Sequence, residues 1–155
     1  MDIQTWHPLT VHFPIAFLLL SGIFSLYLVF KFQKSLAYFN LILLVLGLIG
    51  CGLSIYTGNI EDGKVSRTLC DPTVLKTHEN FAYYLLWAFI INLVFWLIKI
   101  FVFPKSHRIV LSFLIVLSSL IGSACLIYAG HLGASLVYQQ AAGVDVPDDD
   151  CSEFN

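Results

Sequence analysis

The sequence is organised around residues 6–16, which read Trp6-His7-Pro8-Leu9-Thr10-Val11-His12-Phe13-Pro14-Ile15-Ala16. Two histidines and two prolines stand here at the start of an apolar run that continues almost without interruption to Phe30. Pro8 suits a first helical turn, whereas Pro14 lacks an N–H and its ring clashes with the carbonyl of Thr10. We therefore expect a membrane helix whose first turn is kinked or separate, with ionisable side chains at its entrance.

The composition is that of an integral membrane protein. The 155 residues are 58% hydrophobic and 12% charged, whereas a soluble domain is about 25% charged. Four apolar runs each exceed the roughly 18 residues needed to span a hydrocarbon core. We predict an all-α integral membrane protein with one domain over 1–155. It is a four-transmembrane-helix bundle, with helices at about 8–32, 36–57, 72–103 and 107–138 and an acidic tail at 139–155.

The first apolar run has neither a basic n-region nor an A-x-A-like cleavage site, so we expect it to be retained as a helix. Ser35 is the expected N-cap of the second helix. Asp71 is the expected N-cap of the third, with Pro72 at its first position. Residues 58–77 are expected to form the one long polar connection, with a turn at Gly63.

Small residues form a stripe on the second helix, at positions i, i+3, i+7 and i+11: Gly47, Gly50, Ser54 and Gly58. Such a stripe lets membrane helices approach closely. It would also let a flat macrocycle lie against a backbone. Close helix packing is the commoner reason and is the interpretation we favour.

Basic residues predict the orientation. Five of the eight Lys and Arg lie in or beside two short connections, and these are Lys31, Lys34, Lys99, Lys105 and Arg108. The positive-inside rule puts those connections in the cytoplasm. All ten Asp and Glu then face outside, as do both termini, and this acidic face would steer a basic partner. We expect a multi-pass protein of the bacterial inner (cytoplasmic) membrane, with both termini on the periplasmic side.

Four histidines are expected to meet near the outer interface. At about 1.5 Å per residue, His7, His12, His78 and His131 each lie about 28–36 Å from a basic residue at the far end of their own helix. An ionisable side chain at this depth is a candidate functional residue. His107 belongs to the opposite connection and is expected to be solvated.

Bis-histidine ligation across a helix bundle is a common way to hold haem b. We expect two of His12, His78 and His131 to ligate the haem iron, with His7 as a further cofactor-binding candidate. His7 and His12 are about 140° apart on a regular helix, so only one should face the bundle, and His12 is preferred because it lies deeper. For each histidine, the alternative is an interfacial hydrogen bond to a lipid headgroup.

The sequence does not decide whether the cysteines form a disulfide. Cys70 and Cys151 would both lie outside, and either a disulfide or two free thiols are compatible with the sequence. Cys51 and Cys125 lie inside helices and are expected to be small packing residues.

Two motifs resemble those of a bacterial membrane family, the domain of unknown function 2231. They are His7-Pro8-x-x-Val11-His12-Phe13-Pro14-Ile15-Ala16 and Gly130-His131-Leu132-Gly133, the second followed by Leu136-Val137-Tyr138 and Gly143-Val144. The resemblance covers essentially the whole chain. It implies a four-helix membrane protein, often encoded near or fused to respiratory components. Ala134 stands where the family often has a second glycine, and some members lack a histidine at position 131, which favours His12 with His78.

The leading hypothesis is a cytochrome b-like electron-transfer subunit rather than a stand-alone enzyme. It would carry electrons between a membrane quinol or another subunit and a periplasmic cytochrome docked on the acidic face. The alternative is a non-catalytic structural or assembly subunit of a larger respiratory-type membrane complex. A transporter is a weaker interpretation, because almost nothing polar crosses the membrane centre. Lipid contact is expected, and nucleic-acid binding is not.

Overall fold

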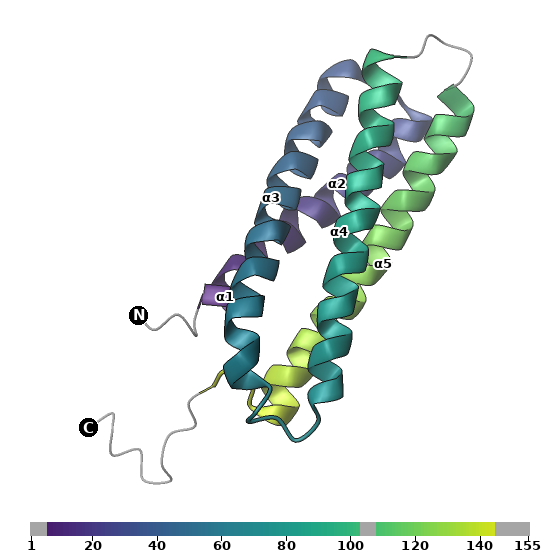
Figure 1. The fold of residues 1–155 in the computed structure, drawn as a ribbon. Helices are drawn as coiled ribbons and strands as arrows, with labels where there is room; N and C mark the ends of the chain where they lie inside the picture. Colours follow the sequence, from purple (N-terminus) through teal and green to yellow (C-terminus); the bar gives the residue numbers. More distant parts are fainter. Residues whose placement is uncertain (1–5, 103–107, 145–155) are drawn as a thin grey trace.

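The computed structural model, which describes residues 6–102 and 108–144, is a bundle of long helices (Figure 1). In chain order these are α1 (Trp6–Thr10), α2 (His12–Phe30), α3 (Lys34–Val65), α4 (Pro72–Phe101) and α5 (Arg108–Gln140). Four spans are long and apolar enough to cross a membrane: Trp6–Phe30, Lys34–Val65, Pro72–Phe101 and Ile109–Gln140. The predicted all-α, four-span architecture is therefore confirmed.

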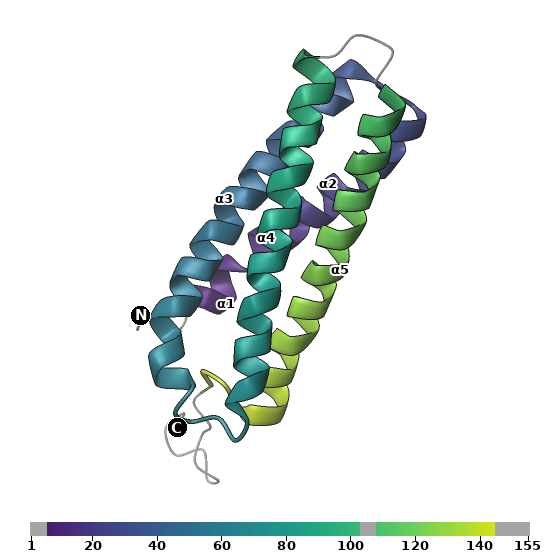
Figure 2. The ribbon, with the colours of Figure 1, turned by 45° about the vertical axis from the view of Figure 1, so that its right-hand side comes forward.

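The bundle has two ends that differ in chemistry. α3, α4 and α5 run alongside one another and α2 crosses behind them, as two views 45° apart show (Figures 1 and 2). We call the end with α1, the last turns of α3 and α5 and the first turns of α4 the histidine end. We call the opposite end, which carries Lys31, Lys34 and Lys99, the basic end. α1 and the end of α5 both lie at the histidine end (Figure 1).

The first span is broken where Pro14 predicts it. α1 ends at Thr10 and α2 begins at His12, with Val11 between them. The bonds around the break continue, because Val11 N donates to His7 O and Ile15 N donates to Val11 O, both at 3.2 Å. Pro14 has no N–H to give to the carbonyl of Thr10. The separate first turn is confirmed, although the helix starts at Trp6 and not at about residue 8.

α3 is longer than expected and continues through Gly58 and Gly63 to Val65, so the connection to α4 is short. The prediction of a polar connection from residue 58, with a turn at Gly63, was wrong. The added turns are stabilised by contacts with α1, where Glu61 accepts a hydrogen bond from His7. α3 also begins at Lys34, which places Ser35 inside the first turn, so Ser35 is not the N-cap.

The expected start of α4 is confirmed. Asp71 is the N-cap and Pro72 the first helical residue. The carboxylate of Asp71 accepts hydrogen bonds from the backbone N–H of Thr73 at 2.9 Å and from its hydroxyl at 2.6 Å. The predicted end of α4 at 103 and the predicted first residue of the last helix, His107, lie outside the described residues.

α5 ends close to the predicted boundary. Past Gln140 the chain turns, with Ala141 at φ 52° and Gly143 at φ 66°. Ala142 N donates back to Leu136 O at 3.0 Å and so satisfies a carbonyl of the last turn. The acidic tail from 145, including Cys151 and its possible pairing with Cys70, lies outside the described residues.

The small-residue stripe packs α3 against the first span, as predicted. A Cβ at Gly47 would lie 2.6 Å from Leu18 Cδ2, and one at Gly50 would lie 3.1 Å from Pro14 Cδ. Around this contact the fully buried apolar side chains come from all four long helices: Leu18, Leu28, Leu44, Phe89, Trp96 and Ile115.

Polar side chains are also buried between the helices. With its amide oriented to satisfy its neighbours, Asn40 donates to Ser21 Oγ at 2.8 Å and accepts from Ser25 Oγ at 3.1 Å and Trp96 Nε1 at 3.2 Å. These bonds join α2, α3 and α4. Sequence analysis did not single out the two serines, although their spacing of four places both on one face of α2.

A second buried amide joins α4 to α5. Asn92 Nδ2 lies 2.9 Å from Ile115 O, Ser118 Oγ and Ser119 Oγ. Within the described part of the chain, Asn92 Oδ1 is the fully buried side-chain oxygen or nitrogen that lacks a partner.

Candidate functional site

Two histidine rings face each other at the histidine end. His7 on α1 and His78 on α4 have ring centroids 6.2 Å apart, and their planes are nearly perpendicular at 87°. Both side chains are partly buried. The structure therefore brings His78 together with His7, and not with His12 or His131.

Each ring is fixed by a backbone carbonyl on another helix. His7 Nδ1 lies 2.8 Å from Ser54 O on α3, and His78 Nδ1 lies 2.8 Å from Ala129 O on α5. A carbonyl oxygen only accepts, so Nδ1 must carry the proton in both rings. In the neutral tautomer Nε2 then holds the free lone pair, which is the arrangement that metal-ligating histidines use.

The two anchors share a local pattern. A glycine stands four residues after each acceptor: Gly58 after Ser54, and Gly133 after Ala129. A Cβ at Gly58 would lie 3.1 Å from His7 Cε1, and one at Gly133 would lie 3.3 Å from His78 Cε1. The missing side chains therefore let the imidazoles reach helix carbonyls that are otherwise covered.

Further polar groups hold α1 against α3. The backbone N–H of His7 donates to Glu61 Oε1 at 3.1 Å. Thr10 Oγ1 lies 3.2 Å from Thr57 Oγ1, which in turn lies 3.4 Å from His7 Nδ1. Because α1 has only five residues, these contacts supply an orientation that the short helix could not maintain alone.

Sequence analysis missed Ser54, Thr57 and Glu61 as supports of the pair. Glu61 was expected to lie outside the helix, and Ser54 acts through its backbone carbonyl, which the sequence does not mark. Two signals were available. One is the small residues at 54 and 58. The other is an acidic residue, Glu61, one helical turn beyond them.

His12 and His131 are exposed. His12 opens α2, and the His131 ring lies 6.4 Å from the Tyr128 ring. Tyr128 packs on Phe81 with centroids 4.5 Å apart, and Phe81 contacts Tyr84 at 5.5 Å. This aromatic cluster joins α4 and α5 near His78.

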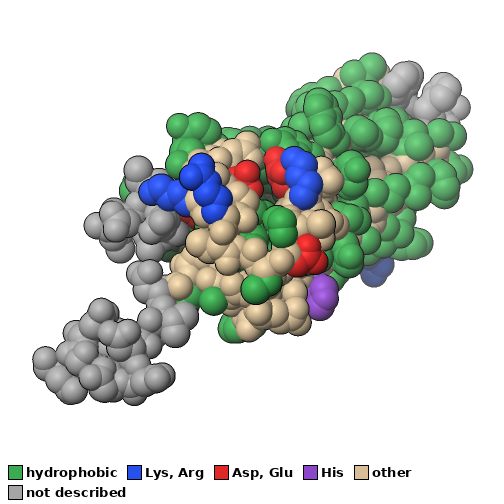
Figure 3. Space-filling view, turned by 60° about the horizontal axis from the view of Figure 1, so that its bottom comes forward, with side chains coloured by type: hydrophobic (Ala, Val, Ile, Leu, Met, Phe, Trp, Pro, Cys, Tyr) green, Lys and Arg blue, Asp and Glu red, His purple; other side chains and the backbone are tan. Residues whose placement is uncertain are grey.

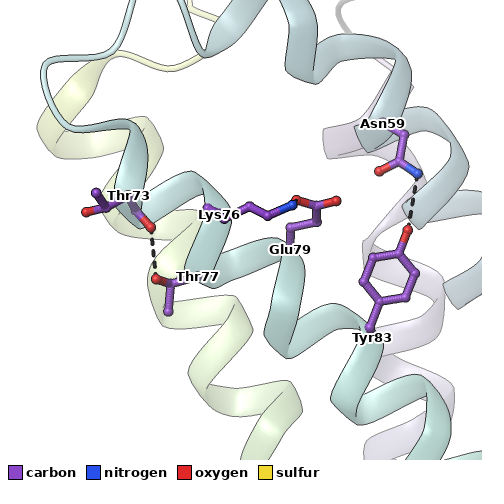
Figure 4. A network of polar contacts seen from close by, with 6 residues as sticks. All are labelled: Asn59, Thr73, Lys76, Thr77, Glu79 and Tyr83. Atoms are coloured by element: carbon purple, nitrogen blue, oxygen red, sulfur yellow. Dashed lines mark hydrogen bonds and ion pairs between the residues drawn. The ribbon is translucent and has the colours of Figure 1, made fainter.

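Glu79, which follows His78, pairs with Lys76. Figure 4 shows this pair with the neighbouring bonds, in which Thr77 Oγ1 donates to Thr73 O at 2.8 Å and Asn59 Nδ2 donates to Tyr83 Oη at 3.3 Å. The ring of His78 is therefore oriented by Ala129 and not by the adjacent carboxylate.

Charges of both signs gather at the histidine end. Figure 3 looks onto this end and shows Lys or Arg beside Asp or Glu, with hydrophobic side chains along the flank. The described acidic residues Glu61, Asp62, Asp71 and Glu79 lie in the same segments as the basic residues Lys64, Arg67 and Lys76. The described part of this end therefore has nearly balanced charge, with four acidic and three basic residues.

His7 and His78 are the residues at this end that could hold a cofactor needing two imidazole donors. Over residues 6–102 and 108–144, no group of three or more His, Cys, Asp or Glu is placed to hold a metal ion.

Comparison of the sequence with known protein families identifies the family of this chain. Residues 4–146 match the family described as "Predicted membrane protein (DUF2231)". No curated protein and no solved structure matches the chain significantly. The match covers nearly the whole sequence and agrees with the four apolar spans. The chain therefore belongs to the DUF2231 family of predicted membrane proteins.

Proposed function

We propose that this protein is a membrane cytochrome b-like electron-transfer subunit in which His7 and His78 ligate one haem b. The observation that supports this most is the facing pair of rings, each with Nδ1 fixed on a backbone carbonyl. Fixing Nδ1 leaves the Nε2 lone pair of each ring available as a donor. The haem would supply one-electron chemistry, and the chain orients the imidazoles and limits access of water.

The spacing of the rings agrees with this role. A haem held by both residues would need two imidazole donors close to one iron. The 6.2 Å between the ring centroids of His7 and His78 supports that assignment. The proposed ligand pair replaces the expected pairs of His78 with His12 or His131, which leaves His12 and His131 as matched controls on the same end of the bundle.

The wider role rests on the distribution of charge. If the basic end faces the cytoplasm, the haem lies near the periplasmic face of the bacterial inner membrane. It would then exchange electrons with a membrane quinol or a neighbouring subunit and with a periplasmic cytochrome.

The test is the dithionite-reduced minus oxidised absorption spectrum of purified protein expressed with ample haem. We expect a b-type α band and a Soret shift in the wild type, in His12→Ala and in His131→Ala. His7→Ala and His78→Ala should lose both signals while circular dichroism still reports helix. His7→Gly should regain the spectrum when free imidazole is added.

Two results would overturn the proposal. A flat spectrum from folded wild-type protein would exclude haem binding. An unchanged spectrum in both His7→Ala and His78→Ala would exclude this ligand pair.

A non-catalytic structural or assembly subunit is the second candidate. It is favoured by the same two Nδ1 bonds, since they also join α1 to α3 and α4 to α5. In that case the wild type is colourless, and His7→Ala and His78→Ala lower thermal stability without any spectral change.

A further inference from the structure

An open groove of about 340 Å³ runs between α4 and α5, which lie side by side (Figures 1 and 2). Its α4 wall includes Tyr84, Trp87 and Phe95, and its α5 wall includes Leu117 and Ile121. Small-molecule sites have volumes of about 300–1,000 Å³ and are mostly apolar with a few polar groups. The groove meets both conditions, and the haem proposal uses none of these residues.

The end of the groove nearer the histidine end lies below the lipid headgroups. The charged first turns of α4 end at Glu79, so we expect the hydrocarbon core to begin at about Phe81. At about 1.5 Å per residue, Tyr84 then lies about 5 Å below that level and Trp87 about 9 Å below it. Because the core is about 30 Å thick, both side chains lie within the apolar layer.

These two side chains bring hydrogen-bond donors into that layer. Trp87 Nε1 can only donate, and the Tyr84 hydroxyl can donate. Over residues 6–102 and 108–144, neither atom forms a hydrogen bond. Further along the groove, the Ser118 hydroxyl already donates to Leu114 O at 2.8 Å, and the remaining lining is apolar. The groove therefore has one donor end, and the rest of it is apolar.

We propose that the groove binds an isoprenoid quinone, whose ring oxygens accept hydrogen bonds from Tyr84 and Trp87 and whose tail lies along Phe95 and Leu117. A quinone carries its acceptors on an uncharged ring, so it can enter the apolar layer. The charged phosphate of a phospholipid is too costly to bury at that depth. An acyl chain alone would fill the apolar part of the groove, but it has no acceptor for the two donors.

The donor end is also the end nearer His78. The Tyr84 and Phe81 rings have centroids 5.5 Å apart, and Phe81 stands about one turn after His78 on α4. The site deepens the proposed function, on which it rests for the use of the electrons. The bound molecule is the membrane quinol that would exchange electrons with the haem.

The test compares menaquinone-4 with geranylgeraniol, which has the same tail without the ring, on purified full-length protein in detergent. Binding is measured by native mass spectrometry and by the rise in thermal stability as each compound is added. We expect the wild type to prefer menaquinone-4. Tyr84→Phe and Trp87→Phe should each weaken its binding about fivefold, because each removes one hydrogen bond. Tyr56→Phe and Trp6→Phe remove the same groups from exposed positions on α3 and α1 and should stay within about twofold of the wild type.

Leu117→Trp keeps both donors but fills the apolar part of the groove, so it should also abolish the preference. An undiminished preference in Leu117→Trp, or in the double variant Tyr84→Phe with Trp87→Phe, would refute the site. Equal binding of geranylgeraniol would show an apolar lipid groove, and a dimer that menaquinone-4 does not dissociate would show an interface between copies. Either result would refute the quinone.

His7→Ala separates this site from the haem proposal, because it should lose the haem spectrum and still bind menaquinone-4 as the wild type does. A wild type that holds haem but shows no preference for menaquinone-4 would refute the groove alone. A wild type that binds menaquinone-4 but no haem would refute the proposed function and leave the groove.

Discussion

The contact between α2 and α3 makes a quantitative prediction for Gly47→Ala. The added Cβ would lie 2.6 Å from Leu18 Cδ2, 2.7 Å from Leu18 Cγ and 3.3 Å from Phe17 Cβ. Leu18 is 0% exposed, so its side chain has no free space into which to move. Overpacking of this kind costs about 1–3 kcal/mol.

Gly52→Ala is the matched control, because it lies on the same helix and its Cβ would meet nothing within 4 Å. Replacing glycine in a helix contributes up to about 1 kcal/mol of stability in both variants, and that gain cancels in the comparison. Gly47→Ala should therefore be less stable than Gly52→Ala by about 1–3 kcal/mol.

The assay is the free energy of unfolding, measured by steric trapping in bicelles. If Gly47→Ala is as stable as Gly52→Ala, the helices are not packed at the distance that the structure gives.

Three further predictions concern single contacts. Hydrogen bonds from the Thr73 hydroxyl and then from its N–H lower the pKa of Asp71 below its ordinary 3.8. The ionised Asp71 cap therefore stabilises α4 at pH values above 3.8. This stabilisation is lost as the pH falls through the lowered pKa of Asp71. Melting curves across the acidic range should show this loss in the wild type and a flatter profile in Asp71→Asn; identical profiles would refute it. Asn92→Leu removes three close contacts and should lower the free energy of unfolding by about 1 kcal/mol, so a variant as stable as the wild type would contradict their role. In Gly58→Ala the added Cβ would lie 3.1 Å from His7 Cε1, whereas in Gly63→Ala it meets nothing within 4 Å. If the proposed haem is bound, only Gly58→Ala should shift its reduction potential, and equal potentials would count against His7 as a ligand.

The sequence predicted most of the fold because its strongest signals are local. Four long apolar runs, the proline at 14 and the Asp71-Pro72 pair each determine structure within a few residues, and the structure agrees with all of them. The end of α3 was mispredicted because residues 58–65 are polar and contain two glycines. The helical conformation of residues 58–65 depends on contacts with α1, and a prediction from local sequence does not take such contacts into account.

The histidine pair could be predicted only in part. The 140° separation correctly implied that His7 and His12 do not both face inward. It could not identify the inward one, because the break at Pro14 resets the rotation of the helix. The residues that fix the two rings could not be predicted for another reason. The acceptors are the backbone carbonyls of Ser54 and Ala129, and since every residue has a carbonyl, neither side chain indicates this role.

Each histidine of the pair and the backbone carbonyl that fixes it lie on different membrane spans, and this has a consequence for biosynthesis. His7 leaves the ribosome with the first span, but its acceptor at Ser54 follows with the second. His78 belongs to the third span, and its acceptor at Ala129 to the fourth. Neither imidazole is held until the next span has entered the membrane, and both are held only once the fourth span is in place. Loading of any ligand on the pair is therefore a post-insertion event, and a nascent chain arrested before α5 should insert three spans and present His78 without an anchor.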